Sequence, residues 1–271
     1  MPENIIQEYT PSIELQEYIR CYWSAQFNAL SRPDLAHSVI PNGTVELIIH
    51  LTDDHCELFS DMWGPSPDHV VLGMYTTPYV VRFRKSVHVF GIRFNPDGFQ
   101  ALAGIPSSHI LQRFEDMEAV GGSPFGTLCS RIRACRNVDA RTDLANNFFR
   151  QNLARHTNDR NYVQTAARLI RQHWSLRMSE LHELLAISPR QLQREFKNQL
   201  GITPKAYMRL ARMSAVHQYL NANGNVDLTT VAHASGFSDQ SHFIREFHTM
   251  TGSRPGDFRK ERSKYLVPGA S

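Results

Sequence analysis

Residues 188–201 read SPRQLQREFKNQLG, and residues 239–252 read DQSHFIREFHTMTG. The two stretches align at an offset of 51 residues, with a shared Arg-Glu-Phe and a shared final glycine. Beyond them, Pro204 aligns with Pro255 at the same offset. Two copies are fewer than the three or so repeats that a solenoid needs. The alignment therefore predicts a small module that occurs twice.

The first copy has the parts of a helix-turn-helix. Residues 178–185 have an amphipathic helical pattern, and Ala186 and Ile187 follow as a turn. Ser188 before Pro189 is typical of a capped helix start. The helix that begins there is expected to bury three residues at four-residue spacing: Leu192, Phe196 and Leu200.

The second copy repeats this plan. Residues 228–235 predict its first helix, which Gly236 is expected to end. Ser238 or Asp239 is expected to cap the second helix. That helix is expected to bury Phe243, Phe247 and Met250.

A long helix is predicted between the two copies. Thr203 is its expected cap, with Pro204 inside it, and Asn223 followed by Gly224 is its expected end. A helix of about 16 to 18 residues spans about 25 Å. Such a strut can hold two recognition helices about one turn of DNA apart, ~34 Å, so that both enter successive major-groove segments.

Charge divides the chain into two unlike halves. Residues 1–159 carry 13 Lys and Arg against 18 Asp and Glu, a net charge of −5. Residues 160–271 carry 16 against 8, a net charge of +8, within an overall +3. The half that contains the duplicated module is thus the half expected to bind a polyanion.

The first hundred residues have the pattern of short strands separated by turns. Strands are expected at residues 45–51, 79–83 and 87–94, with turns at 41–43 and 95–98. This part of the chain is predicted to be mostly β.

From residue 123 onward the strand signals stop. Residues 125–135 and 138–155 have apolar residues at helical spacing, which predicts a helical connector. Residues 158–161 read NDRN. They include Asn and Asp and no apolar residue, and we expect a hinge there.

The expected fold class is therefore α+β. Residues 1–112 are expected to form a β-rich domain, for which the family resemblance given next implies a cupin-like barrel with a sensor-like role, and residues 113–158 a helical connector available for dimerisation. Residues 159–264 are expected to form an all-α DNA-binding domain, with two helix-turn-helix units joined by the long helix.

The second half resembles the AraC/XylS family of regulators, over residues 162–262. The most specific stretch is residues 236–247, GFSDQSHFIREF, followed by Gly252, Pro255 and Phe258. The first copy departs from the family pattern, because Ala186 stands where members often carry glycine. The front half also resembles the β-rich sensor-like domains of some members, which implies a small-molecule or protein signal.

The polar faces of the two second helices supply the candidates for reading DNA bases. Arginine can donate two hydrogen bonds to guanine and glutamine can pair with adenine, both in the major groove. The candidates, at positions that the family resemblance also implies, are Arg190, Gln193, Arg194, Gln240, Ser241 and Arg245. A solvated polar helix face is the alternative reading of both sets.

Other basic side chains are candidates for phosphate contacts, which fix register without reading sequence. They are Lys197, Lys205, Arg209, Arg254 and Lys260.

The front half offers a candidate pocket but no convincing metal site. Glu46 and Arg93 fall on predicted strands and could line a ligand pocket, although alternation alone does not say which way they face. The front-half histidines lack the close pairing with a carboxylate that a metal-binding barrel needs, so no metal and no cofactor is expected. They are His37, His50, His55, His69 and His88.

The four cysteines favour reduced, buried thiols. Cys21, Cys56, Cys129 and Cys135 form no C-x-x-C pair, which argues against a zinc knuckle or a disulfide scaffold. No catalytic constellation with recognisable spacing is present in the sequence, so no catalytic residue and no enzyme is expected.

Three functions follow from these patterns, in order. The first is a sequence-specific transcription regulator that binds double-stranded promoter or operator DNA, answers a small-molecule effector, forms a homodimer and contacts RNA polymerase if it activates. The second is an enzyme, either a metal-dependent β-barrel or a cysteine-based DNA-repair protein, fused to a DNA-binding module. The third is an adaptor whose DNA-binding half is degenerate.

The start of the chain bears on its location. Residues 1–10 lack the basic start and the apolar run of a signal peptide, and no stretch approaches the ~20 apolar residues that span a bilayer. A bacterial cytoplasmic, nucleoid-associated protein that does not use a membrane is expected.

Overall fold

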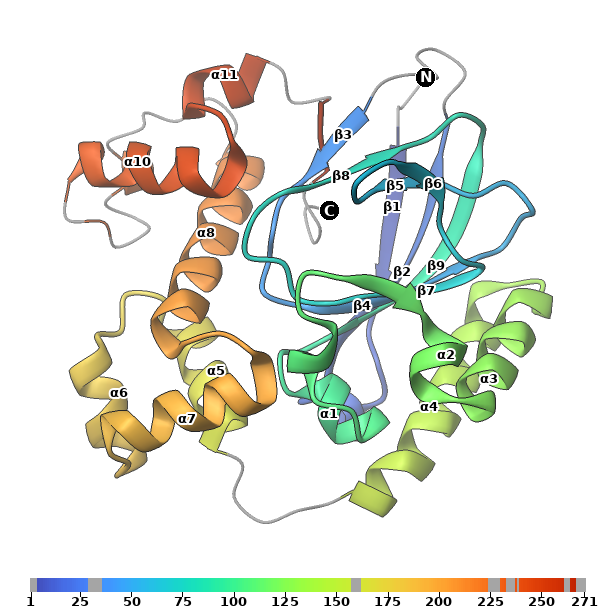
Figure 1. Cartoon of the computed structure of the whole chain (residues 1–271), viewed down its shortest axis with the longest axis horizontal. Coiled ribbons are helices and arrows are strands. Elements are labelled where there is room, and N and C mark those ends of the chain that lie inside the picture. Colours follow the sequence, from blue (N-terminus) through green and yellow to red (C-terminus); the bar gives the residue numbers. More distant parts are fainter. Residues whose placement is uncertain are drawn as a thin grey trace.

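The computed structural model describes residues 4–28, 36–156, 162–223, 230–232, 237, 239–260 and 264–266. Its first part is a two-sheet β structure covered on one side by helices, and its second part is helical (Figure 1). The predicted α+β class, with a β-rich front and a helical back, is confirmed.

The larger sheet has six strands, all paired antiparallel. In spatial order they are β1 (Asn4–Tyr9), β2 (Ile19–Phe27), β9 (Val87–Phe94), β4 (Val45–His50), β7 (His69–Leu72) and β10 (Phe114–Asp116). The smaller sheet has five strands: β11 (Tyr265–Leu266), β3 (Ala36–Val39), β8 (Tyr79–Arg82), β5 (Glu57–Phe59) and β6 (Trp63–Pro65). The strand predictions near residues 45, 79 and 87 are confirmed.

The central strands of the larger sheet are buried on both faces. In β9, Phe90 and Ile92 pack toward the covering helices, whereas Val89 and Arg93 line the space between the two sheets. In a sheet covered on both sides, the sequence of each strand is an almost continuous run of apolar residues and does not alternate. This is why the sequence could not say which way Glu46 and Arg93 face.

Helices cover the outer face of the larger sheet. Phe125 and Phe149 come from two of them and share a core cluster with sheet residues such as Phe90 and Phe94. The helical segments of this part are η1 (Ile13–Leu15), α1 (Gly98–Ala103), η2 (Ser107–Ile110), α2 (Met117–Gly121), α3 (Ser123–Ala134) and α4 (Val138–His156).

The predicted connector needs a correction. Residues 113–158 were expected to be helical, but their first element is the strand β10, which pairs with β7 at the edge of the larger sheet. The helices α3 and α4 then pack on that sheet instead of standing apart from it. A three-residue edge strand carries too little pattern to be recognised in sequence.

The described residues of the second part form helices. They are α5 (Tyr162–Gln172), α6 (Met178–Leu185), α7 (Pro189–Leu200), α8 (Pro204–Asn223), α10 (Gln240–Thr251) and α11 (Pro255–Lys260). The predictions for α6, α7, α8 and α10 are confirmed, and α8 is slightly longer than expected, at 20 residues. The predicted hinge at 158–161, Gly236, Ser238 and most of the helix expected at 228–235 lie outside the described residues.

The helix starts are capped as the sequence predicted. The Ser188 hydroxyl accepts from the Gln191 N–H at 3.2 Å, and the Thr203 hydroxyl accepts from the Ala206 N–H at 3.1 Å. Of the two candidates for α10, Asp239 accepts from the His242 N–H at 2.7 Å. These caps fix where α7, α8 and α10 begin.

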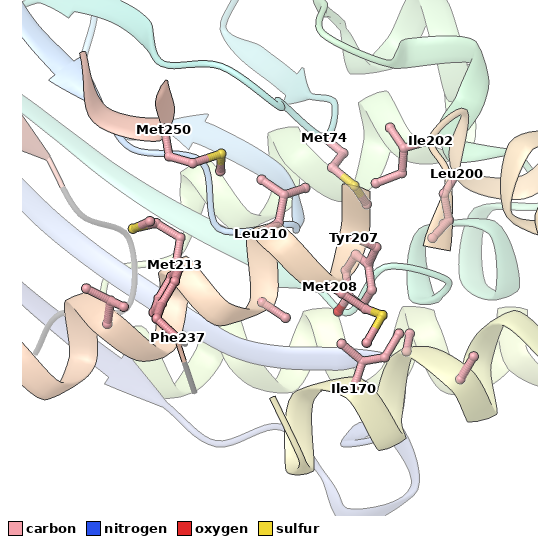
Figure 2. Close-up of a cluster of buried hydrophobic side chains, with 14 of the residues drawn as sticks. Met74, Ile170, Leu200, Ile202, Tyr207, Met208, Leu210, Met213, Phe237 and Met250 are labelled. Carbon is pink, nitrogen blue, oxygen red and sulfur yellow. The ribbon is translucent and has the colours of Figure 1, made fainter. Parts of the chain in front are cut away.

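The two parts of the chain share one hydrophobic core. Ile40 and Met74 from the β structure belong to the same buried cluster as Tyr207, Leu210 and Met213 of α8. Figure 2 shows Met74 beside the side chains of Ile202 and Tyr207. The strut between the two helix-turn-helix units is therefore packed against the β structure.

Candidate nucleic-acid interface and barrel cavity

The recognition helix of the first unit, α7, has a buried and an exposed face. Leu192, Phe196 and Leu200 are fully buried against α5 and α8. The remaining face is exposed along the length of the helix, and it carries Arg190, Gln193, Arg194 and Lys197. These side chains are three or four residues apart, so one surface presents all four together.

Arg194 and Lys197 of this face make only weak contacts. Arg194 lies 3.4 Å from the carboxylate of its neighbour Glu195, and Lys197 lies 3.4 Å from the Gly201 carbonyl, at the end of the helix. Exposed pairs of this kind contribute about 0–1 kcal/mol. Both groups can therefore exchange these partners for a polyanion at little cost.

The second recognition helix, α10, repeats the arrangement. Phe243, Phe247 and Met250 are buried, and Gln240, Ser241 and Arg245 are exposed. The structure thus brings the candidates of each copy onto one helix face, as the repeat predicted.

The basic candidates for phosphate contacts differ in their surroundings. Lys205, Arg254 and Lys260 are exposed. Arg209 is half-buried on α8, and its Nε donates to Glu246 Oε2 of α10 at 2.6 Å. This ion pair ties the strut to the second recognition helix, and sequence reasoning missed it because the partners lie 37 positions apart.

A cavity lies between the two sheets of the β structure. Sixteen residues from both sheets line it, and Glu46 and Arg93 are the charged ones. Both sequence candidates for a pocket therefore face inward.

A buried ion cluster forms one wall of this cavity. Arg93 donates from Nε to Glu46 at 2.9 Å and from Nη1 to Glu8 at 2.6 Å. Burial alone would lower the pKa of Arg93, but Glu46, Cys21 and Glu8 together raise it above its ordinary value, so the guanidinium stays charged. Sequence reasoning missed Glu8, which stands on an edge strand 85 positions from Arg93.

A second polar group at the cavity contains a thiol and an imidazole. Cys56 Sγ lies 3.6 Å from His50 Nε2, and Ser66 Oγ lies 3.1 Å from the same nitrogen. Burial raises the pKa of Cys56 to about 11 and lowers the pKa of His50 to about 4. Near neutral pH the pair is a thiol and a neutral imidazole, which is unsuited to nucleophilic chemistry.

The described residues contain neither a metal-binding cluster nor a membrane-spanning helix. No group of three or more His, Cys, Asp or Glu side chains among them is arranged to hold a metal ion. Within the same ranges, no helix is both long and apolar enough to cross a membrane.

Two family models match the chain in separate regions. Residues 181–261 match a helix-turn-helix domain. Residues 7–116 match a domain of unknown function (DUF6597).

Curated relatives match mainly over the helix-turn-helix region. The transcriptional activator RhaS of Shigella boydii serotype 18 is 38% identical over 82 residues, which is 30% of this chain and 29% of that protein. RhaS of Escherichia coli O139:H28 is 36% identical over 31% of this chain and 30% of its own length. The chain thus spans less than a third of these relatives. RhaS of Pectobacterium atrosepticum is 22% identical over 79% of this chain and 76% of its length.

Solved structures resemble the chain over nearly its whole length. ToxT from Vibrio cholerae has a TM-score of 0.52 at 11% identity, covering 95% of this chain and 98% of ToxT. ToxT from strain O395 has a TM-score of 0.51 at 12% identity, covering 96% and 98%. At these identities the likeness concerns the fold. These matches extend the resemblance to the AraC/XylS family: residues 181–261 match a helix-turn-helix domain, and the fold over nearly the whole chain is similar to that of ToxT.

Proposed function

We propose that the protein is a sequence-specific DNA-binding transcription regulator that reads two successive major-groove segments. The observation that carries the proposal is the pair of exposed recognition faces, on α7 and α10, mounted on one buried strut. Within the described residues, no hydrogen bond occupies the side chains of Arg190, Gln193 or Gln240. Groups of this kind are free to pair with base edges.

In this proposal each helix has base-reading and phosphate-contacting members. Arg190, Gln193 and Arg194 read one segment, and Gln240, Ser241 and Arg245 read the other. The phosphate contacts come from Lys197, Lys205, Arg209, Arg254 and Lys260. Arg209 keeps its terminal nitrogens for phosphate while its Nε is held by Glu246.

The signal enters through the barrel cavity. A concave, mostly apolar space with a few polar groups is the usual form of a small-molecule site. One ToxT structure with a TM-score of 0.50 is bound to (E)-4-(8-methylnaphthalen-1-yl)but-3-enoic acid. We propose that a small organic effector occupies the cavity of this chain, with Glu46 and Arg93 in its wall.

Assembly and location complete the proposal. A groove between α3 and α4, lined by Leu128, Leu144 and Phe148, is the surface proposed for a homodimer.

The protein acts without catalysis in the bacterial cytoplasm at the nucleoid, and it contacts RNA polymerase if it activates. The protonated thiols of Cys56 and Cys21, whose pKa values burial raises to about 11 and about 12, favour this over a cysteine-based enzyme.

The salt dependence of DNA binding tests this function. We expect the affinity of the full chain for promoter DNA to fall steeply with salt, and Lys197→Ala to flatten the slope by about 0.9, the value of one phosphate contact. Lys85→Ala is the matched control, because Lys85 pairs with Asp54 on the β structure. Affinity that is independent of salt, or an equal effect of both variants, would rule the proposal out.

A further inference from the structure

The last described strand of the chain closes the cavity of the first domain. Leu266 of β11 is one of the lining residues. β11 pairs in parallel with β3, and the Ile40 N–H donates to the Leu266 carbonyl at 2.9 Å. Residues that follow the second helix-turn-helix unit therefore complete the wall of the barrel.

The two side chains of β11, Tyr265 and Leu266, make different contacts, because successive side chains in a strand point to opposite faces. Leu266 faces the cavity. The Tyr265 ring lies 4.5 Å from that of Phe258 of α11, centroid to centroid, and its hydroxyl lies 2.5 Å from Ser253 Oγ. Phe258 in turn packs edge-to-face on Phe247 of the recognition helix, at 5.3 Å. Three contacts thus connect the cavity to α10.

The cavity is too small for most organic molecules as it stands. Its volume is about 80 Å³, whereas an apolar cavity that admits benzene measures ~150 Å³. A larger ligand must displace a wall residue. Most wall residues belong to strands paired on both sides, whereas Ile6 and Leu266 belong to the edge strands β1 and β11, which have one neighbour each among the described residues. β11 has two residues against the six of β1, so Leu266 costs less to move than Ile6.

The charged side chains in the cavity wall favour an uncharged ligand. Arg93 faces two carboxylates, Glu8 and Glu46, so the cluster has a formal charge of −1 and offers no cationic site for an acid. Within the described residues, Nε1 of Trp23 is buried without a hydrogen-bond partner, and Trp23 lines the cavity. An acceptor on the ligand would give this donor the partner that it lacks.

We infer that the barrel cavity takes an uncharged, apolar ligand bearing one hydrogen-bond acceptor, and that this ligand displaces Leu266, detaches β11 from β3 and so removes the tether between the barrel and the second helix-turn-helix unit, which stays packed on α8. The inference rests on the proposed function, in which the cavity receives the signal. β11 thus acts as a latch between the barrel and this unit. Once the tether is removed, the unit can adjust to the major groove, so the ligand raises affinity for DNA that contains both blocks.

The ligand class is tested with 1-octanol and octanoate, which differ in their head group. Calorimetry on the full chain should show 1-octanol binding at least about tenfold more tightly, because octanoate would add a charge beside Glu8 and Glu46. Glu46→Gln should narrow the difference. Binding of neither compound, or preferential binding of octanoate, overturns the ligand class.

The latch is tested by hydrogen exchange at the Ile40 amide, which donates to Leu266. Saturating 1-octanol should accelerate exchange at Ile40 at least about tenfold, while amides in the centre of β9 stay protected. Bound 1-octanol with unchanged protection at Ile40 overturns the latch. This readout needs no DNA, so a failure of the latch and a failure of DNA binding are separate results.

Coupling to DNA is tested with two variants. Val39→Cys with Leu266→Cys places thiols at paired positions that both line the cavity. Once oxidised, it should no longer respond to 1-octanol, and once reduced it should show the wild-type gain in DNA affinity of about fivefold or more. Tyr265→Ala should still bind 1-octanol but lose that gain. A gain that persists in the oxidised variant or in Tyr265→Ala contradicts the route through β11.

Discussion

Ala186 and Gly201 both end a helix of the first helix-turn-helix unit in the left-handed backbone region. Ala186 follows α6 at φ +49°, and Gly201 follows α7 at φ +76°. Glycine adopts this region without steric penalty, whereas alanine does not. The departure from the family pattern at 186 therefore places strain in the turn that aims α7.

Ala186→Gly is expected to raise the free energy of unfolding by about 0.5–1 kcal/mol, because relief of the positive φ outweighs the added freedom of the unfolded chain. Urea unfolding measures this change in the free energy of unfolding. Gly201→Ala is the matched control and should destabilise, since its new Cβ would lie 2.9 Å from Leu111 Cδ2 and 3.3 Å from Ser108 Cα. A destabilised Ala186→Gly protein would show that the turn is not strained.

At the scale of elements, the helices of the second half could be predicted well because their signals are local. Three side chains each accept a hydrogen bond from the backbone N–H three residues further on: Ser188, Thr203 and Asp239. The start of a helix is therefore determined by residues within one helical turn. The edge strands β10 and β11 could not be predicted, because they are short and pair with strands far away in the chain. For the same reason the Glu8 contact to Arg93 was missed, although Glu46 and Arg93 were identified.

The ion pair between Arg209 and Glu246 is the element-scale feature that fixes α10 to the strut. Both side chains are partly buried, with exposed fractions of 40% and 24%. We expect a coupling free energy of about 0.5–1 kcal/mol in a double-mutant cycle of Arg209→Ala and Glu246→Ala, measured by urea unfolding. Additive effects of the two substitutions would show that the pair does not hold the helix.

At the scale of the whole molecule, the β structure and the DNA-binding half meet in one core, and a buried acid lies at their boundary. Asp97 is 1% exposed, and neither carboxylate oxygen has a hydrogen-bond partner among the described residues. Burial raises its pKa to about 6, against the opposing effects of its own backbone N–H and, less strongly, of Arg171 from α5. The folded protein therefore binds this proton more tightly than the unfolded chain does.

Asp97→Asn is expected to change how stability depends on pH. In the wild type, the contribution of Asp97 is favourable at low pH and is lost as pH rises from about 4 to about 6. The variant should thus be more stable than the wild type by about 3 kcal/mol at pH 7.5, and this advantage should vanish near pH 4. Thermal or urea unfolding between pH 4 and 8 measures it.

His50 acts in the opposite direction over the same range. Burial lowers its pKa to about 4, so its contribution to stability is complete above about 6.5 and is lost as pH falls. With Asp97 removed, the loss of stability in acid should be steeper than in the wild type. Parallel curves for the two proteins would contradict the buried, protonated state of Asp97.

We propose that α7 and α10 read two blocks of DNA about one helical turn apart. Selection of random DNA by the full chain, followed by sequencing, tests this, with Arg194→Ala and Arg245→Ala alongside and Lys85→Ala of the β structure as control. We predict a motif of two short blocks, blurred at one position of one block by Arg194→Ala and of the other by Arg245→Ala, and unchanged by Lys85→Ala. Retention of DNA without any motif, or a motif insensitive to both recognition-helix variants, would contradict the account.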